Sequence, residues 1–291
     1  VFLDYDQAAL DAAYDQAAYA PNREQLIARR IAESAMARAR VGTPERVAYG
    51  SAAIETLDIY RARRTPAPIF VFIHGGAWRS GRAEEFALAA EMFRDAGAHY
   101  VVPDFCWVQE AGGSLLVLAD QVRRAIAWVY RHAAAFGGDP GRLYVGGQSS
   151  GGHLAAVALT TDWRRDFDLP ADMLKGGLLL SGMYELAPVR LSKRSLYVAF
   201  DDRTIAELSP QRHLDNLHAP LVLIYGTLET PEFQRQSRDF AAAVAAAGKP
   251  VRLLVGNHYN HFELQETLGN PYGLAGRAAL ELMGLNRETA R

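Results

Sequence analysis

The sequence predicts an α/β fold built on one mostly parallel, doubly wound sheet with helices on both faces. Short apolar runs typical of buried strands alternate along the chain with longer segments of helical period, which is the order that such a sheet requires. The chain has 291 residues, of which 49% are hydrophobic, and a formal net charge of −2, so it can bury one large core. We therefore expect a single domain over residues 1–291.

Each expected element follows from a local pattern. Residues 24–40 form an arginine-rich amphipathic segment, expected to be a helix with a solvated face, and residues 47–60 indicate a hairpin around Gly50 and Ser51. The expected strands are residues 69–73, 99–103, 142–146, 176–181, 220–225 and 251–255. The expected helices are residues 83–96, 115–134, 151–161, 232–247 and 273–284. Right-handed crossovers between parallel strands place the functional loops at the carboxyl edge of the sheet.

One segment does not fit the alternation of strand and helix. Residues 183–215 have no buried-strand pattern and carry large apolar or aromatic side chains that include Tyr184, Tyr197, Phe200 and Leu208. We expect a helical insertion over the sheet. Together with residues 1–40 it would form a cap, and the alternative, left open by the sequence, is a solvent-side excursion anchored by its aromatic residues.

The turn at 147–151, Gly-Gln-Ser-Ser-Gly, follows an expected strand and opens an expected helix. A Gly-x-Ser-x-Gly turn at such a corner presents the serine hydroxyl above the sheet, near the positive end of the helix, and its glycines avoid Cβ clashes. The isolated pattern also fits an ordinary turn, so its context decides. Ser149 is the candidate nucleophile.

A second glycine-rich loop supplies that context. Residues 74–78, His-Gly-Gly-Ala-Trp, directly follow the first fully apolar run. Acyl transfer needs N–H donors for a developing oxyanion, and a loop of this kind after an early strand provides them. We expect the backbone N–H groups of Gly76, Ala77 and Ser150 to form the oxyanion hole. The imidazole of His74 is not needed there, and we expect it to be structural.

A serine nucleophile also needs a base and an orienting acid, which in this arrangement follow it in the order acid, then histidine. Glu229 lies in the loop after the penultimate expected strand and is the candidate acid. Glu232, the runner-up, falls in the first turn of the next helix, where a surface carboxylate is favoured in any case. The loop after the last strand holds two histidines, and we prefer His261 to His258 because it lies just before a helix-forming stretch.

With these motifs the chain resembles the kynurenine formamidase (arylformamidase) group of α/β-hydrolases, close to the hormone-sensitive-lipase-like esterases. The resemblance covers most of the chain. It rests on Leu57-Asp58-Ile59-Tyr60, His74-Gly75-Gly76-Ala77-Trp78 with Arg79-Ser80-Gly81, Asp120-Gln121-Val122, Gly147-x-Ser149-x-Gly151 with His153-Leu154, Ser181-Gly182, residues 231–237 and His261-Phe262-Glu263. It implies an α/β-hydrolase fold and an oxyanion hole formed by the amides of Gly76 and Ala77.

The chain departs from the pattern of that family at three places. The nucleophile is flanked by Gln148 and Ser150 where the family usually has histidine and alanine, and Glu229 replaces the usual aspartate, a change that related hydrolases accept. Residues 103–107 replace an Asp-Tyr-Arg-like run in a loop that lines the family's pocket. The expected pocket residues are Trp78, Phe105, Cys106, Trp107 and Tyr184.

We therefore expect a serine hydrolase that cleaves an ester or amide bond with a small acyl group and an aromatic leaving group. His261 would deprotonate Ser149, and Glu229 would fix the tautomer of His261. The resemblance implies substrates like N-formylkynurenine. A broad aryl or carboxyl esterase or arylamidase is the alternative within this class, and a non-catalytic ligand receptor on the same fold is the alternative from another class.

Composition and residue spacing argue against several other classes of protein, namely nucleic-acid-binding, membrane-spanning, disulfide-bonded and metal-dependent ones. The balanced charge carries no nucleic-acid signature, and no segment approaches the ~20 apolar residues that span a bilayer, so we expect a cytoplasmic protein. One cysteine, Cys106, excludes an internal disulfide and is expected to be a buried apolar side chain. His258 and His261 lack a third ligand, so no metal or other cofactor is expected. The expected partner is a small-molecule aryl ester or amide, with a homodimer left open.

Overall fold

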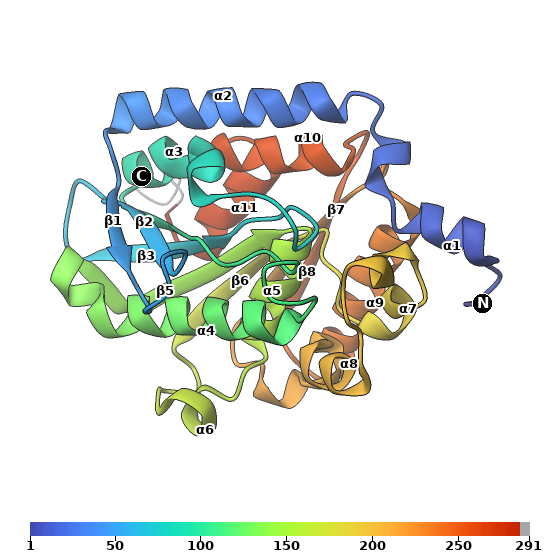
Figure 1. Cartoon of the computed structure of the whole chain (residues 1–291). Coiled ribbons are helices and arrows are strands. Elements are labelled where there is room, and N and C mark those ends of the chain that lie inside the picture. The colour runs from blue at the N-terminus through green and yellow to red at the C-terminus, as the bar shows by residue number, and fades with distance from the viewer. Residues whose placement is uncertain (286–291) are drawn as a thin grey trace.

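The computed structural model describes residues 1–285 and shows an eight-stranded sheet with helices on both faces (Figure 1). The strand order is β1-β2-β4-β3-β5-β6-β7-β8, in which β2 pairs antiparallel with both of its neighbours and the other pairs are parallel. The strands are β1 (Glu45–Ala48), β2 (Thr56–Tyr60), β3 (Ala67–Ile73), β4 (His99–Pro103), β5 (Gly138–Gln148), β6 (Leu174–Leu180), β7 (Leu221–Gly226) and β8 (Val251–Gly256). The predicted fold class is confirmed.

The helices are α1 (Gln7–Ala13), α2 (Arg23–Val41), α3 (Ala90–Ala96), α4 (Leu115–His132), α5 (Ser150–Leu159), α6 (Trp163–Phe167), α7 (Leu186–Arg190), α8 (Asp202–Leu208), α9 (Pro231–Ala246), α10 (His261–Glu266) and α11 (Leu274–Leu282). The 3₁₀ helices are η1 (Gln16–Tyr19), η2 (Ala83–Ala89), η3 (Ala133–Phe136), η4 (Lys193–Leu196), η5 (Pro210–Arg212), η6 (Leu214–Asn216) and η7 (Thr267–Gly269).

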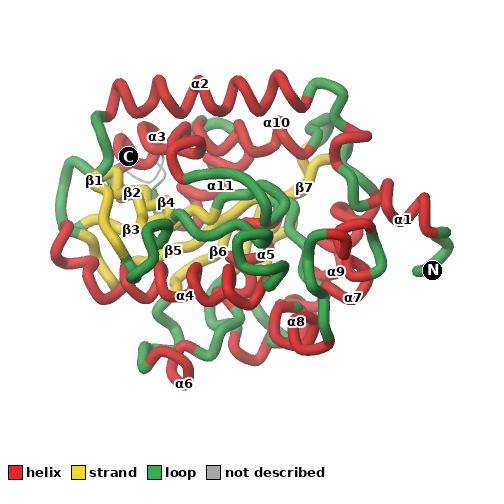
Figure 2. The backbone as a smooth tube through the Cα atoms, in the orientation of Figure 1, coloured by secondary structure: helices red, strands yellow, loops and turns green. Residues whose placement is uncertain are grey.

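Two apolar layers enclose the sheet, because alternate side chains of its central strands point to opposite faces. In β3, Ile69, Val71 and Ile73 belong to the core shared with α4, α5 and α9. Phe70 and Phe72 belong to the core shared with η2, α3 and α11. Helices α2, α3, α10 and α11 gather on one side of the sheet and α4 and α5 on the other (Figure 2).

Most expected elements are found, with differences that have local causes. The hairpin over 47–60 is confirmed as β1 and β2, and it begins two residues earlier. The helix expected over 83–96 is observed as the 3₁₀ helix η2, which is interrupted at Phe86 by a non-helical backbone (φ −122°, ψ 22°), followed by α3. Strand β5 begins before 142, since Gly138 already pairs with Ala67 ahead of a register shift.

The insertion over 183–215 is helical, as expected, and contains α7, η4, α8, η5 and η6. Residues before α2 pack against it: Gln7 Nε2 donates to the Leu191 carbonyl oxygen (2.8 Å), and Lys193 N donates to Asp11 Oδ1 (2.6 Å). Helix α2 instead packs on η2, α3 and α10. The expectation that all of residues 1–40 join the insertion is therefore wrong, because the turn between η1 and α2 carries the chain to the other side of the sheet.

Two further properties concern residues 1–285. None of their helices is both long and apolar enough to cross a membrane. Nor do their histidine, cysteine, aspartate and glutamate side chains form a group of three that could hold a metal ion.

Candidate active site

Ser149 lies at a sharp corner between β5 and α5. Its backbone has φ 58° and ψ −125°, a conformation that non-glycine residues rarely adopt, and its N–H donates to the Leu180 carbonyl oxygen of β6 (2.8 Å). A Cβ atom on Gly151 would lie 2.1 Å from the Ile73 carbonyl oxygen, and one on Gly147 would lie 2.3 Å from that of Gly151. Both glycines are therefore required by close backbone approach, as in a nucleophile elbow.

The glycine-rich loop after β3 runs beside this corner. A Cβ atom on Gly75 would lie 3.3 Å from Ser149 Cβ, so the two loops are in contact. Gly76 has φ 122°, and Ala77 and Trp78 also have positive φ values, which turns the loop sharply. Over residues 1–285, the N–H groups of Gly76 and Ala77 take part in no hydrogen bond, so they are free to donate to a substrate.

The imidazole of His74 is buried beneath this loop. Its Nδ1 donates to the Gly75 carbonyl oxygen (3.0 Å), and its ring stacks on Phe105 with 4.3 Å between ring centroids. Burial lowers the pKa of His74 to about 4, because the charged form would lose its hydration. A neutral, stacked imidazole is suited to shaping the loop, which is the role expected from the sequence.

Glu229 is buried, and its carboxylate accepts four hydrogen bonds. Oε1 accepts from Ser181 Oγ (2.5 Å) and from Gly226 N (2.7 Å). Oε2 accepts from His261 Nδ1 (2.7 Å) and from Gln16 Nε2 (3.1 Å). These donors come from four separate segments of the chain, so the carboxylate has one position and one orientation.

His261 is the first residue of α10, and its position depends on the cap of that helix. Asn260 accepts from the N–H groups of residues 262 and 263, while Glu263 accepts from Asn260 N, which completes a capping box. Gln148 Nε2 donates to the His261 carbonyl oxygen (3.2 Å) and joins His261 to the corner at Ser149. Because Nδ1 is bound to Glu229, Nε2 is the ring nitrogen that is available to accept a proton from the Ser149 hydroxyl. In residues 1–285 no hydrogen bond joins His261 to Ser149.

His258 and Glu232, the alternative candidates for the base and the acid, lie outside the cluster formed by Glu229 and His261. His258 is exposed, and its backbone N–H donates to Thr227 Oγ1 (2.8 Å). Glu232 is in the first turn of α9, as expected, but the expectation of a surface carboxylate is wrong. It is fully buried, ion-paired with Arg235 (2.7 Å) and bound by the Tyr14 hydroxyl (2.9 Å), because the N-terminal segment covers this end of α9.

The five expected pocket residues have different surroundings. Trp78, Phe105, Cys106 and Tyr184 are buried, whereas Trp107 is partly exposed. Trp78 Nε1 donates to His153 Nδ1 (3.2 Å), and Tyr184 stacks on Phe240 with 4.3 Å between ring centroids. Burial raises the pKa of the Cys106 thiol, which favours the neutral form expected for an apolar side chain. That these residues contact the substrate stays a prediction.

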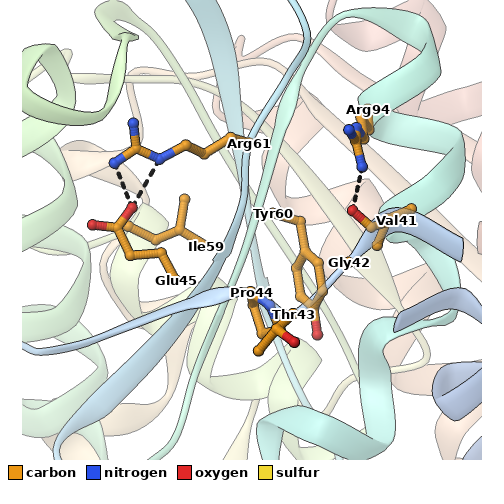
Figure 3. Close-up of a pocket in the computed structure, with 9 residues that line it drawn as sticks. All are labelled: Val41, Gly42, Thr43, Pro44, Glu45, Ile59, Tyr60, Arg61 and Arg94. Atoms are coloured by element: carbon orange, nitrogen blue, oxygen red, sulfur yellow. Dashed lines mark hydrogen bonds and ion pairs between the residues drawn. The ribbon is translucent and has the colours of Figure 1, made fainter. Parts of the chain in front are cut away.

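A groove elsewhere on the molecule is not part of this site. It measures about 200 Å³ and is lined by residues 41–45 and 59–61 together with Arg94 (Figure 3). Tyr60, on its wall, pairs with Tyr100 near the amino end of β4. Because Ser149 and His261 follow the carboxyl ends of β5 and β8, this groove lies at the opposite edge of the sheet.

Gln16 and Ser181 contact the candidate acid but were not among the expected site residues. Gln16 is buried, and it is 213 residues away from Glu229 in the sequence. No local pattern could indicate that contact. Ser181 directly follows the carboxyl end of β6, where functional side chains gather, and Ser181-Gly182 is also one of the motifs of the family resemblance, so both signals were available.

Comparisons with known proteins show what this chain is similar to. A family model described as BD-FAE matches residues 57–176, a span that contains both glycine-rich loops. Kynurenine formamidase from Danio rerio is 28% identical over 245 residues, covering 82% of this chain and 81% of that protein. Kynurenine formamidase from Salmo salar is 30% identical over 247 residues, with the same coverage. The crystal structure of esterase LipW from Mycobacterium marinum is 21% identical and superposes with a TM-score of 0.72, covering 91% of this chain and 88% of that chain.

Proposed function

This chain belongs to the kynurenine formamidase family of α/β-hydrolases, and from that premise we propose that it hydrolyses arylformamides with Ser149, His261 and Glu229 as its catalytic triad. It is a serine hydrolase of the arylformamidase and esterase type. The observation that carries the proposal is the 2.7 Å contact between His261 Nδ1 and Glu229, beside the strained elbow of Ser149.

The proposed reaction begins with proton transfer. His261 Nε2 accepts the proton of the Ser149 hydroxyl as Oγ attacks the formyl carbon. The N–H groups of Gly76, Ala77 and Ser150 stabilise the negative charge that develops on the carbonyl oxygen. Ser150 is the first residue of α5, so its N–H has no acceptor within the helix.

The tetrahedral intermediate then collapses. His261, now an imidazolium, donates its proton to the nitrogen of the departing arylamine, and a formyl ester of Ser149 remains. Water attacks this ester while His261 accepts one of its protons, and His261 then returns that proton to Ser149 Oγ as formate is released. Glu229 holds the imidazole in the tautomer that carries a proton on Nδ1, which both steps require.

The same arrangement explains how a glutamate serves in place of an aspartate. Its longer side chain would normally sample more rotamers, at a cost in conformational entropy when it is fixed. Here Ser181 and Gly226 hold Oε1 while Gln16 and His261 hold Oε2. We propose further that the chain acts as one domain, in which residues 1–20 and 183–215 cover the site.

A substrate series tests the proposed reaction. Formanilide, acetanilide and aryl esters of increasing acyl length are compared by kcat/KM with the purified protein. We expect the formyl compounds to be the best substrates and kcat/KM to fall steeply as the acyl group grows. A preference for longer acyl esters over formanilide would instead identify an aryl esterase, and the absence of turnover with every compound would refute the hydrolase assignment.

A further inference from the structure

The side chain of Gln148 lies where three parts of the proposed site meet. It is the last residue of β5, it directly precedes Ser149, and it is buried. Its Nε2 donates to the carbonyl oxygen of His261 (3.2 Å), a residue 113 positions away in the sequence. A Cβ atom on Gly75 would lie 2.7 Å from its Oε1. One buried amide therefore contacts both the glycine-rich loop and the backbone of the proposed base.

The hydrogen bond from Gln148 is the direct link between the segment that carries His261 and the corner that carries Ser149. Within residues 1–285, no other hydrogen bond joins residues 256–266 to residues 147–151. The ring of His261 is bound to Glu229, which follows a different strand, β7. The positions of the proposed base and the proposed nucleophile relative to each other therefore depend on the amide of Gln148.

The direction in which His261 Nε2 points depends on two anchors. Glu229 holds Nδ1 (2.7 Å) and so fixes one point of the ring. Because a histidine side chain rotates about two bonds, the direction of Nε2 also depends on where the backbone is held. Helix α10 has six residues, and a helix this short is not rigid by its own hydrogen bonds. The backbone of His261 therefore needs an external anchor, and Gln148 provides it.

The start of α10 is also held from the direction of α2. Asn260 Nδ2 donates to Asn22 Oδ1 (3.0 Å), and Asn22 Nδ2 donates to Glu263 Oε1 (3.3 Å). Asn22 directly precedes α2, which lies with α10 on one side of the sheet (Figure 1). These contacts tie the helix to another surface element, whereas Gln148 ties it to β5. Only the contact from Gln148 fixes α10 relative to the strand that ends at Ser149.

The amide of Gln148 has little freedom to shift. Its oxygen and nitrogen are fixed relative to each other by the planar group, so any displacement of Nε2 toward or away from His261 also displaces Oε1. Oε1 already lies against Gly75, which has no side chain that could move aside. A displacement of Gly75 would in turn move Gly76 and Ala77, the next residues of the loop. The amide therefore sets the spacing between the proposed base and the proposed oxyanion donors.

We propose that Gln148 is a positioning residue, which holds the backbone of His261 so that Nε2 faces the hydroxyl of Ser149. The inference rests on the proposed triad and adds a residue that acts through the base, without contact to the substrate. A misplacement of about 1 Å lowers a reaction rate by about 100-fold, whereas one neutral hydrogen bond contributes little to folding. Loss of the amide is therefore expected to lower the rate of the chemical step far more than the stability of the fold.

Labelling of Ser149 by a fluorophosphonate tests the inference independently of the natural substrate. The dependence of labelling on reagent concentration separates the rate constant of the bound reagent from its affinity. Two variants, Gln148→Met and Gln148→Leu, fill the space of the side chain without an N–H donor. The matched control is Asn216→Leu, which removes another bond from a side-chain amide to a backbone carbonyl oxygen, that of Thr160 at the far end of α5 (3.4 Å).

We expect both Gln148 variants to lose about 10- to 100-fold in the labelling rate constant, with the affinity changed by no more than about threefold. Asn216→Leu should react as wild type, and thermal midpoints should show that every variant is folded. Labelling at the wild-type rate in either folded Gln148 variant, or a loss confined to affinity, would overturn the inference. So would a loss of equal size in Asn216→Leu, which would make the bond from Gln148 one of several that only stabilise the fold.

Hydrolysis of formanilide separates this inference from the proposed reaction. In Gln148→Met we expect kcat to fall as the labelling rate does, with KM changed by no more than about threefold. If wild type is labelled but does not hydrolyse formanilide, the proposed reaction fails, and labelling still decides the role of Gln148. If wild type is not labelled at all, Ser149 is not activated by His261, and the inference fails with the proposed triad.

Discussion

Gln16 Nε2 donates a hydrogen bond to Glu229 Oε2, the same oxygen that accepts from His261 Nδ1. The other end of the Gln16 amide, Oε1, accepts from Thr230 N (3.2 Å). Because the amide is held at both ends, it cannot rotate without losing both contacts. The N-terminal segment thus contributes a positioning residue to the proposed triad.

We expect Gln16→Ala to lower kcat by about 10- to 100-fold with little change in KM, since a hydrogen bond to a charged group contributes about 1.5–3 kcal/mol. Gln16→Glu should be worse, because two carboxylates would then repel each other. Gln7→Ala, which removes a contact between α1 and the insertion but none to Glu229, is the matched control. Steady-state kinetics measures all three, and an unchanged kcat in Gln16→Ala would show that the contact is only structural.

Ser149→Ala should abolish turnover, with a loss on the order of 10⁶ in kcat, and should leave the folded state intact. Labelling by a fluorophosphonate should disappear in the same variant. Circular dichroism and the thermal midpoint provide the control for folding. Residual activity within about tenfold of wild type would exclude Ser149 as the nucleophile.

His261→Ala should be as damaging as the serine substitution, whereas His258→Ala should be mild, because His258 is exposed and makes no side-chain contact with Glu229. Residues that act as a unit are not additive, so the double variant Ser149→Ala with His261→Ala should be barely slower than either single variant. Measured kcat values decide the matter: an inactive His258→Ala beside an active His261→Ala would reverse the assignment.

Two glutamine substitutions should separate catalysis from stability. Glu229→Gln should lower kcat by roughly 10³- to 10⁴-fold, since an amide favours the wrong imidazole tautomer. Glu232→Gln should instead lower the free energy of unfolding, by about 2 kcal/mol, because it breaks a buried ion pair whose partner Arg235 retains Asp239. Kinetics and urea unfolding are measured on both variants, and a large kcat loss confined to Glu232→Gln would transfer the acid to that position.

His153 predicts a pH dependence of stability. Its Nδ1 accepts from Trp78 and its Nε2 donates to the Leu208 carbonyl oxygen (2.8 Å), so a second proton has no acceptor, and burial lowers its pKa to about 4. The unfolded chain takes up that proton near pH 6.5, so the contribution of His153 to stability is complete above pH 6.5 and falls by up to about 3 kcal/mol as pH drops to 4. His153→Gln should unfold in urea with a correspondingly weaker pH dependence, and His218→Gln, at an exposed position, should behave as wild type.

The parts that could be predicted from the sequence depend on neighbouring residues. The fully apolar run of β3 and the glycines around Ser149 each determine their own geometry through burial or close approach. The parts that could not be predicted depend on distant residues. Gln16 contacts Glu229 because the fold brings η1 beside that carboxylate, and Glu232 is buried because Tyr14 covers it.

The contact between Gln16 and Glu229 also bears on how the enzyme is made. The two residues are 213 positions apart, so at a synthesis rate of roughly 5–20 residues per second the ribosome reaches the second about 10–40 seconds after the first. Ser149 emerges in between, when neither the proposed acid nor the proposed base has yet been translated. A nascent or truncated chain would therefore present the proposed nucleophile without the groups proposed to activate it, and we expect hydrolytic activity only after the early and late parts of the polypeptide have met.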